Sequence, residues 1–330
     1  MNDVTYRTFA RGDTGPLVEL IARGMPHDAV SRDWFTEFVL LDPNFDPDGL
    51  IVAADTTSGR PVGFVYAVRG TGSTGIPVDP DGGWVTIGVV DPDVRRCGIG
   101  TELISRATEF LRSAGAAWTV YSGYPPAYFL PGLDAELYPD GLRLLERAGF
   151  RTVSRPVAMS LSLSGFTVPD AVSDLRATRE AEGYTFGPAT GDDLPDVMAF
   201  ARDEIASDWG EVIRSAVVRS GRPERVVLAR TPDNAVAGFA IYGAYRGVVE
   251  RFGPFGVAEQ LRGLGLGKII LHETLRNMRD EGATDAWFLW TGPETPAGRL
   301  YLSTGFSITR TFHVMRADLS LSGDNEETNR

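Results

Sequence analysis

The feature that most constrains this chain is a glycine-rich loop that occurs twice, each time between a strand-like run and a helical pattern. The first copy is Arg95-Arg-Cys-Gly-Ile-Gly100 and the second is Arg262-Gly-Leu-Gly-Leu-Gly267, so both read Arg-x-x-Gly-x-Gly. In each copy a valine, Val90 or Val257, lies eight residues before the first of these two glycines. A repeat with matched flanks predicts two copies of one folding unit.

Each loop opens directly onto a helical pattern, Thr101 to Leu111 in the first copy and Ile269 to Met278 in the second. The main-chain N–H groups of a first helical turn have no partner within the helix, and they lie at the positive end of the helix dipole. Glycine lets a ligand approach the main chain closely. The loops are therefore expected to bind a phosphate group.

Two common phosphate-binding loops do not fit. A dinucleotide fold needs Gly-x-Gly-x-x-Gly, but the third position is Leu103 in the first copy and Ile270 in the second. A P-loop needs Gly-x-x-x-x-Gly-Lys followed by Ser or Thr. Around Lys268 that pattern would begin at Arg262 and end at Ile269, so it fails at both ends.

Both loops resemble the pyrophosphate loop of the GNAT N-acetyltransferase superfamily, whose signature is Gln/Arg-x-x-Gly-x-Gly/Ala. Nearly the whole chain is similar to two GNAT domains in tandem. The resemblance implies an α/β fold with a mixed sheet, in which each domain has a mostly antiparallel central sheet flanked by helices. It also implies an enzyme, an N-acetyltransferase that uses acetyl-CoA as co-substrate and an amine as acceptor.

The order of strand-like and helical patterns predicts the domain boundaries. Residues 1–165 form the N-terminal domain, 166–183 a linker rich in Ser, Pro, Ala and charge, 184–320 the C-terminal domain and 321–330 a polar, disordered tail. In this interpretation each domain ends on its own last strand, near Val153 to Leu163 in the first and Ile308 to Met315 in the second.

The two halves differ in the interval between the loop and a later Gly-Phe pair. The interval from Gly98 to Gly149 is longer than that from Gly265 to Gly305, and the extra residues fall in a Pro- and aromatic-rich segment, Tyr124 to Tyr138. GNAT folds commonly hold part of the substrate or acyl pocket there. The first domain is therefore elaborated at this place, where the insert either shapes a pocket or packs only as a loop.

The resemblance assigns cofactor contacts to main-chain groups. The loop N–H groups would bind the pyrophosphate, and an N–H on the preceding strand would stabilise the thioester oxygen. The expected cofactor-binding residues are Val90, Arg95, Arg96, Cys97, Gly98, Ile99, Gly100 and Thr101 in the first domain, and Val257, Arg262, Gly263, Leu264, Gly265, Leu266, Gly267 and Lys268 in the second.

The expected acid is a tyrosine, which in GNAT enzymes commonly follows the fifth strand and protonates the departing thiolate. Tyr301 stands at the matching place in the second domain. Alignment of the two Gly-Phe pairs puts Leu145 there in the first domain, and leucine cannot donate a proton. The second domain is therefore predicted to be catalytic, with the first as its support. Tyr138 in the insert is the alternative acid of the first domain.

The expected base is Glu250, at the start of the strand leading to Val257. It would take the proton that the ammonium group loses before attack. Some GNAT members carry a glutamate close to this position, although the register here differs by about one residue. The ungapped equivalent in the first domain is Gly83, and Glu294 is a second candidate base.

Composition limits the other partners. The net charge of −12 argues against nucleic acid as a partner and favours a cationic substrate such as an amine. No apolar run approaches the roughly 20 residues of a membrane span, and no apolar signal region opens the chain, so we expect no membrane partner and a cytoplasmic location. The single cysteine, Cys97, and the scattered histidines predict neither an internal disulfide nor a metal site.

The leading hypothesis is a transferase that moves an acetyl group from acetyl-CoA to a primary amine of a small molecule by direct attack, in the C-terminal domain. The alternatives are a non-catalytic acyl-CoA-binding or sensing protein, and catalysis in the N-terminal domain. The acceptor, the acyl chain length and the choice between monomer and homodimer stay open.

Overall fold

The computed structural model describes residues 3–70, 79–125 and 128–319 and divides the chain into two compact units. The first unit contains residues 1–156 and 311–330, and the second contains residues 157–310. Each unit combines a mostly antiparallel sheet with flanking helices, which confirms the predicted fold class. No helix among the described residues is long and apolar enough to cross a membrane.

The first unit is built on a sheet with the strand order β1-β2-β3-β4-β5-β14-β6. The β4 and β5 strands run parallel, whereas the other paired strands are antiparallel. The strands are β1 (Val4–Thr8), β2 (Leu50–Asp55), β3 (Pro61–Val68), β4 (Gly82–Val90), β5 (Trp118–Tyr121), β6 (Arg151–Ser154) and β14 (Val314–Asp318).

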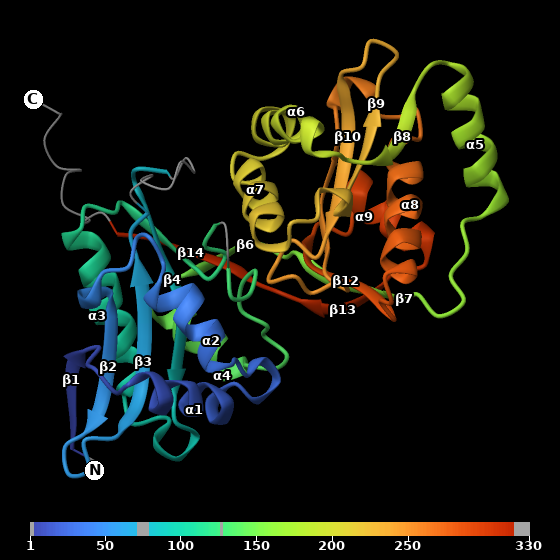
Figure 1. Cartoon of the computed structure of the whole chain (residues 1–330). Helices are drawn as coiled ribbons and strands as arrows, with labels where there is room; N and C mark the ends of the chain where they lie inside the picture. The colour runs from blue at the N-terminus through green and yellow to red at the C-terminus, as the bar shows by residue number, and fades with distance from the viewer. Residues whose placement is uncertain (1–2, 71–78, 126–127, 320–330) are drawn as a thin grey trace, which may run out of the picture. The chain divides into compact units, whose positions relative to one another are not determined.

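Helices cover both faces of this sheet (Figure 1). Successive residues of a strand point to opposite faces, so Gly63 and Phe64 on β3 mark the two sides. Above Gly63 lies Leu103 of helix α3, and the ring of Phe64 is 6.2 Å from that of Phe35 in α2. The helices are α1 (Thr14–Gly24), α2 (Arg32–Phe35), α3 (Ile99–Ser113) and α4 (Pro139–Arg147).

The strands β4 and β5 separate within the sheet. They pair only from Gly82 opposite Trp118 to Val85 opposite Tyr121. A bulge follows at Thr86, because Val85 and Ile87 pair with adjacent residues of β3. The rest of β4, up to Val90, has no strand beside it on the β5 side in the described part of the sheet.

The second unit contains two smaller sheets, with the strand orders β11-β10-β9-β8 and β12-β7-β13. A single parallel bridge, between Arg251 and Trp287, joins the start of β11 to β12. The strands are β7 (Val157–Ser162), β8 (Thr185–Pro188), β9 (Val226–Arg230), β10 (Val236–Tyr242), β11 (Phe252–Val257), β12 (Asp285–Thr291) and β13 (Ser307–Thr311).

The helices of the second unit repeat the arrangement of the first (Figure 1). On one face of β10, Gly238 lies under Ile270 of α8. On the other face, the ring of Phe239 is 6.2 Å from those of Phe200 in α6 and Trp209 in α7. The helices are α5 (Asp170–Ala181), α6 (Leu194–Phe200), α7 (Trp209–Ser220), α8 (Leu266–Asp280) and α9 (Pro296–Thr304).

Each unit takes one strand from the other half of the sequence. The strand β7, expected to complete the first domain, pairs with β12 and β13 of the second unit. The single strand predicted from Ile308 to Met315 is divided between β13, which belongs to the second unit, and β14, which pairs with β5 and β6 of the first. The units therefore differ from the predicted ranges 1–165 and 184–320, because apolar alternation identifies a strand but does not say which sheet edge it joins.

The predicted linker, residues 166–183, is part of the second unit. It contains helix α5, and Arg176 of this helix forms an ion pair with the buried Glu273 of α8 at 2.8 Å. The predicted tail, residues 321–330, lies outside the described residues.

Candidate functional site

The two glycine loops have the same main-chain shape. Left-handed φ angles occur at Arg96 (64°) and Gly98 (84°) in the first loop and at Gly263 (87°) and Gly265 (79°) in the second. Gly98 and Gly265 are the residues immediately before helices α3 and α8. In each loop a left-handed residue occurs at every second position. Such a main chain turns successive N–H groups toward one concave side, which suits an anion.

The residues behind the two loops also correspond. A Cβ atom placed on Gly100 would lie 3.0 Å from Leu144 and 3.6 Å from Val90. A Cβ atom placed on Gly267 would lie 3.7 Å from Leu300 and 3.3 Å from Val257. The loop, the end of the preceding strand and the later helix therefore meet in the same way in both units.

In the first unit, the end of β4 presents main-chain N–H groups to the opening between the strands. The N–H of Asp91 donates to the carbonyl of Val62 on β3 at 2.8 Å. Because successive N–H groups of a strand point to opposite edges, those of Gly88 and Val90 point away from β3. Both residues are half-buried. The N–H of Val90 can therefore donate a hydrogen bond to a ligand at this edge, whereas the N–H of Gly88 already donates to the hydroxyl of Tyr121.

The second unit repeats this edge. The N–H of Ala258 donates to the carbonyl of Ala237 on β10 at 3.0 Å, so the N–H groups of Phe255 and Val257 point away from β10. The predicted role of Val90 and Val257 as main-chain donors is therefore compatible with the strand geometry. The same geometry adds Phe255 as a donor, which lies two residues before Val257 and was not expected from the sequence.

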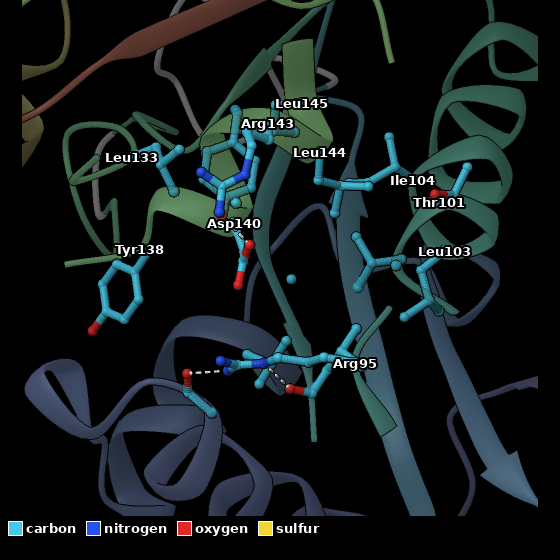
Figure 2. Close-up of a pocket in the computed structure, with 18 of the residues that line it drawn as sticks. Arg95, Thr101, Leu103, Ile104, Leu133, Tyr138, Asp140, Arg143, Leu144 and Leu145 are labelled. Carbon is cyan, nitrogen blue, oxygen red and sulfur yellow. Dashed lines mark hydrogen bonds and ion pairs between the residues drawn. The ribbon is translucent and has the colours of Figure 1, made fainter. Parts of the chain in front are cut away.

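A cavity of ≈510 Å³ opens beside the edge N–H groups of the first unit. Figure 2 shows Leu103 and Ile104 of α3 on one side of it, and Leu133 and Tyr138 of the insert on another. Leu144 and Leu145 of α4 also line it, together with the glycine loop. Three residues of the insert, Leu133, Leu137 and Tyr138, therefore line this cavity.

The loop side chains of the first unit have separate roles. Arg95 donates to the carbonyl of Gly24 at 2.8 Å and to that of Val90 at 3.3 Å, so its side chain fastens the end of β4 to the end of α1 (Figure 2). Ile99 is buried in the core and can offer a ligand only its main chain. Arg96 and Cys97 are exposed beside the loop.

The second loop has a side chain against it. A Cβ atom on Gly265 would lie 2.7 Å from Cδ2 of Leu175 in α5, whereas a Cβ atom on Gly98 would meet nothing within 4 Å. Lys268 and Arg262 are exposed near this loop, and the side chain of Leu266 is buried. Leu175 cannot be predicted as a loop contact from the sequence, because the composition of residues 166–183 indicates a linker.

Tyr301 lies inside an aromatic cluster where β11 and β12 part. Its ring is 4.5 Å from Phe288, 5.5 Å from Phe306, 5.9 Å from Phe252 and 6.0 Å from Phe255. Burial raises its pKa well above the usual value. Its hydroxyl has no hydrogen-bond partner among the residues that the structure describes. The cluster thus holds a neutral phenol.

The first unit has a leucine at the corresponding place. Phe150 N–H donates to the carbonyl of Leu145 at 3.0 Å, and Phe306 N–H donates to the carbonyl of Tyr301 at 3.1 Å. The two helices therefore end in the same way, and the structure supports the sequence alignment of Leu145 with Tyr301. The alternative acid, Tyr138, lines the cavity, and its hydroxyl donates to Asp28 at 2.6 Å.

Glu250 lies in the turn before β11 rather than within the strand. Its main-chain carbonyl accepts a hydrogen bond from Trp287 at 2.9 Å, and its half-buried side chain has no ion pair in the described chain. Its neighbour Arg251 stacks on Tyr245 and Trp287. The other candidate base, Glu294, accepts a hydrogen bond from Arg299 through its main chain.

The family model for the acetyltransferase (GNAT) family matches residues 17–129 and 196–306 of this chain. The chain belongs to the GNAT family. The two matches confirm two GNAT domains in tandem, and with them the acyltransferase class. A mycothiol acetyltransferase of Clavibacter michiganensis subsp. michiganensis is 28% identical over 297 residues, which cover 88% of this chain and 87% of the relative.

Solved structures of low sequence identity share the tandem GNAT fold. The GCN5-related glucosamine N-acetyltransferase region of a fungal multi-domain β-N-acetylglucosaminidase has a TM-score of 0.79 at 18% identity, and the match covers 96% of this chain and 38% of the fungal chain. A tandem GNAT protein of the clavulanic acid biosynthesis pathway has a TM-score of 0.63 at 17% identity, with 97% of this chain and 100% of that chain covered.

Proposed function

We propose that this GNAT protein transfers the acetyl group of acetyl-CoA to a primary amine of a small molecule, by direct attack of the amine on the thioester. The observation that carries the proposal is the convergence of a glycine loop and the edge N–H of Val90 on one cavity of ≈510 Å³ in the first domain. The similarity to a mycothiol acetyltransferase supports a small-molecule acceptor.

The residues around this cavity fit the parts of acetyl-CoA. The loop from Gly98 to Thr101 offers main-chain N–H groups for the pyrophosphate. Apolar side chains, including Leu103 and Leu144, suit the pantetheine chain. The N–H of Val90 suits a carbonyl oxygen. The first domain therefore binds acetyl-CoA in this proposal.

The second domain carries the chemistry in this proposal. The N–H groups of Phe255 and Val257 stabilise the charge that develops on the thioester oxygen as the new C–N bond forms. Tyr301 gives its proton to sulfur as the C–S bond breaks. Glu250 takes the proton that the amine loses, directly or through water. Tyr301 suits this role because its phenol is neutral and has no partner in the described structure.

A second candidate function is acyl-CoA binding without turnover. Two features of the second domain favour it. Four phenylalanine rings enclose Tyr301, and Leu175 of α5 covers one side of the loop at Gly265. We therefore expect acetyl-CoA to bind the second domain more weakly than the first.

Each loop contains its own chemical reporter, which allows the two sites to be measured separately. Cys97 is the only cysteine of the chain and Lys268 is its only lysine, and both are exposed. Iodoacetamide labelling of Cys97 and amine-reagent labelling of Lys268 can be followed by peptide mass spectrometry. We expect acetyl-CoA to protect both residues, and to protect Cys97 at the lower concentration.

The same preparation is then assayed for release of free CoA with a panel of small primary amines. Protection of both residues together with amine-dependent release supports the proposed transferase. Protection without release for any amine supports the binding protein instead. If acetyl-CoA protects neither residue while the protein is folded by circular dichroism, acetyl-CoA is not its ligand and both candidate functions fail.

A further inference from the structure

The cavity of the first domain contains a phenol that comes from a different element than Tyr301. Tyr121, the last residue of β5, lines this cavity together with Gly88, Val90 and Leu145. It pairs with Val85, at the end of the paired stretch of β4 and β5. Tyr121 therefore lies where the two strands begin to separate.

The register of the strands shows which residue of the second domain corresponds to Tyr121. In the first domain Trp84 lies opposite Val120, and in the second Arg251 lies opposite Trp287. The next residue after Trp287 is Phe288, which thus occupies the place of Tyr121.

Phenol and apolar side chain have exchanged places between the domains. The first domain has Tyr121 on the strand and Leu145 on the helix, and the second has Phe288 on the strand and Tyr301 on the helix. The rings of Phe288 and Tyr301 are 4.5 Å apart, so these two positions are neighbours. Each domain therefore has one phenol at the opening between its strands.

The hydroxyl of Tyr121 is close to one of the edge N–H groups. Its side chain is largely buried, and burial raises its pKa to about 12, while a hydrogen bond from the main-chain N–H of Gly88 acts in the opposite direction. The phenol is neutral, and its proton has no acceptor among the described residues. Tyr138, the other phenol of the cavity, already donates to Asp28.

We propose that the hydroxyl of Tyr121, oriented by the N–H of Gly88, donates a hydrogen bond to the thioester carbonyl of acetyl-CoA in the first domain, so that this site selects acetyl-CoA over free CoA. A carbonyl oxygen accepts the hydrogen bond of the phenol, whereas the thiol of free CoA is only a weak acceptor. Tyr121 is thus a specificity-determining residue. The inference rests on the proposed binding of acetyl-CoA to the first domain.

The experiment compares acetyl-CoA and CoA by isothermal titration of the full chain as wild type, Tyr121→Phe and Tyr138→Phe. The first site is recognised as the one lost in Gly98→Glu. We expect Tyr121→Phe to reduce the preference of this site for acetyl-CoA over CoA by about three- to tenfold, the effect of one lost hydrogen bond. Affinity for CoA itself stays unchanged. Tyr138→Phe leaves the ratio of the two affinities as in wild type.

Phenylalanine is accommodated at this position of the fold, since Phe288 occupies it in the second domain. Carbonyl-labelled [1-¹³C]acetyl-CoA gives a second readout, because loss of a hydrogen bond moves the bound carbonyl resonance to lower frequency. An unchanged affinity ratio and an unchanged resonance in Tyr121→Phe would overturn the role of Tyr121 but not the proposed binding of acetyl-CoA to the first domain. If neither acetyl-CoA nor CoA binds at a site that Gly98→Glu removes, the proposed cofactor binding of the first domain fails instead.

Discussion

Tyr301 is the residue whose replacement best tests where the chemistry occurs. Tyr301→Phe removes the proton donor and keeps the ring in its aromatic cluster, so we expect kcat to fall about 10²-fold with little change in KM for acetyl-CoA. The measurement is steady-state release of free CoA with the best amine found. Tyr121→Phe is the matched control, because it removes the other domain's phenol. Equal turnover by wild type and Tyr301→Phe means that another group is the acid.

Glu250 is tested through the pH dependence of the reaction. If its carboxylate takes the ammonium proton, Glu250→Gln lowers kcat/KM about 10²-fold near neutral pH, and the loss shrinks as pH rises because more of the amine is already deprotonated. Rates are measured from pH 6.5 to 9.5 with the same amine. Glu294→Gln serves as the control. A deficit that is constant across this range contradicts the role as base.

Some residues of the candidate site can be predicted from the sequence, and others cannot. The loop glycines could be predicted, because left-handed φ angles and close packing at Gly98 and Gly100 restrict side chains. The equivalence of Leu145 and Tyr301 in the two domains could be predicted from the alignment of the two Gly-Phe pairs. Tyr121 was missed because the run Ala117 to Tyr121 indicates only a strand, and alternation does not show where that strand leaves its neighbour.

Helix α5 is the element whose role differs most from expectation. Its sequence is rich in charge and small residues, so it was interpreted as a linker, yet Arg176 pairs with Glu273 and Leu175 covers Gly265. Both contacts depend on residues far away in the sequence. A pattern that is local to residues 166–183 therefore could not reveal them.

The contact between Leu175 of α5 and the second loop leads to a testable prediction. Leu175→Ala removes the side chain from Gly265, so we expect acetyl-CoA to protect Lys268 at a lower concentration than in wild type. The protection of Cys97, which reports the first loop, should not change. Val172→Ala, a truncation of a buried side chain on the same helix, is the control for general loosening of α5. Identical protection curves for Leu175→Ala and wild type would show that Leu175 does not restrict access.

The whole molecule is expected to lose stability at alkaline pH. Burial raises the pKa of Tyr66, Tyr121, Tyr124, Tyr242 and Tyr301, whereas an unfolded tyrosine titrates near 10. Above that pH the unfolded chain releases protons that the folded chain retains, so stability is complete below pH 10 and falls as pH rises beyond it. The chain contains one lysine, so few other side chains titrate there.

This loss is measured as the melting temperature between pH 8 and pH 11. Each buried phenol contributes up to about 1.4 kcal/mol of lost stability per pH unit above 10. Tyr301→Phe should therefore show a shallower decline than wild type over the alkaline range, while Cys97→Ser should match wild type. A melting temperature that stays constant up to pH 11 contradicts the burial of these phenols.

The exchange of β7 and β14 predicts how the halves of the chain behave when separated. Residues 1–165 alone lack β14, and residues 166–330 alone lack β7. Each piece would leave the edge of a neighbouring strand without its partner, so we expect each to be insoluble or poorly folded when expressed alone. Pieces that are expressed separately, remain soluble and each melt cooperatively would contradict this.

The position of β14 also determines when the first domain can finish folding. Domains usually fold in order of synthesis, N-terminal first. Here the strand that lies between β5 and β6 is Val314–Asp318, near the end of the described chain. While the ribosome makes the second half, the first domain exists without this strand, and the nascent chain must keep its sheet edge from pairing with other proteins. Neither half can be inherited or exchanged as an independent module, because each encodes a strand of the other.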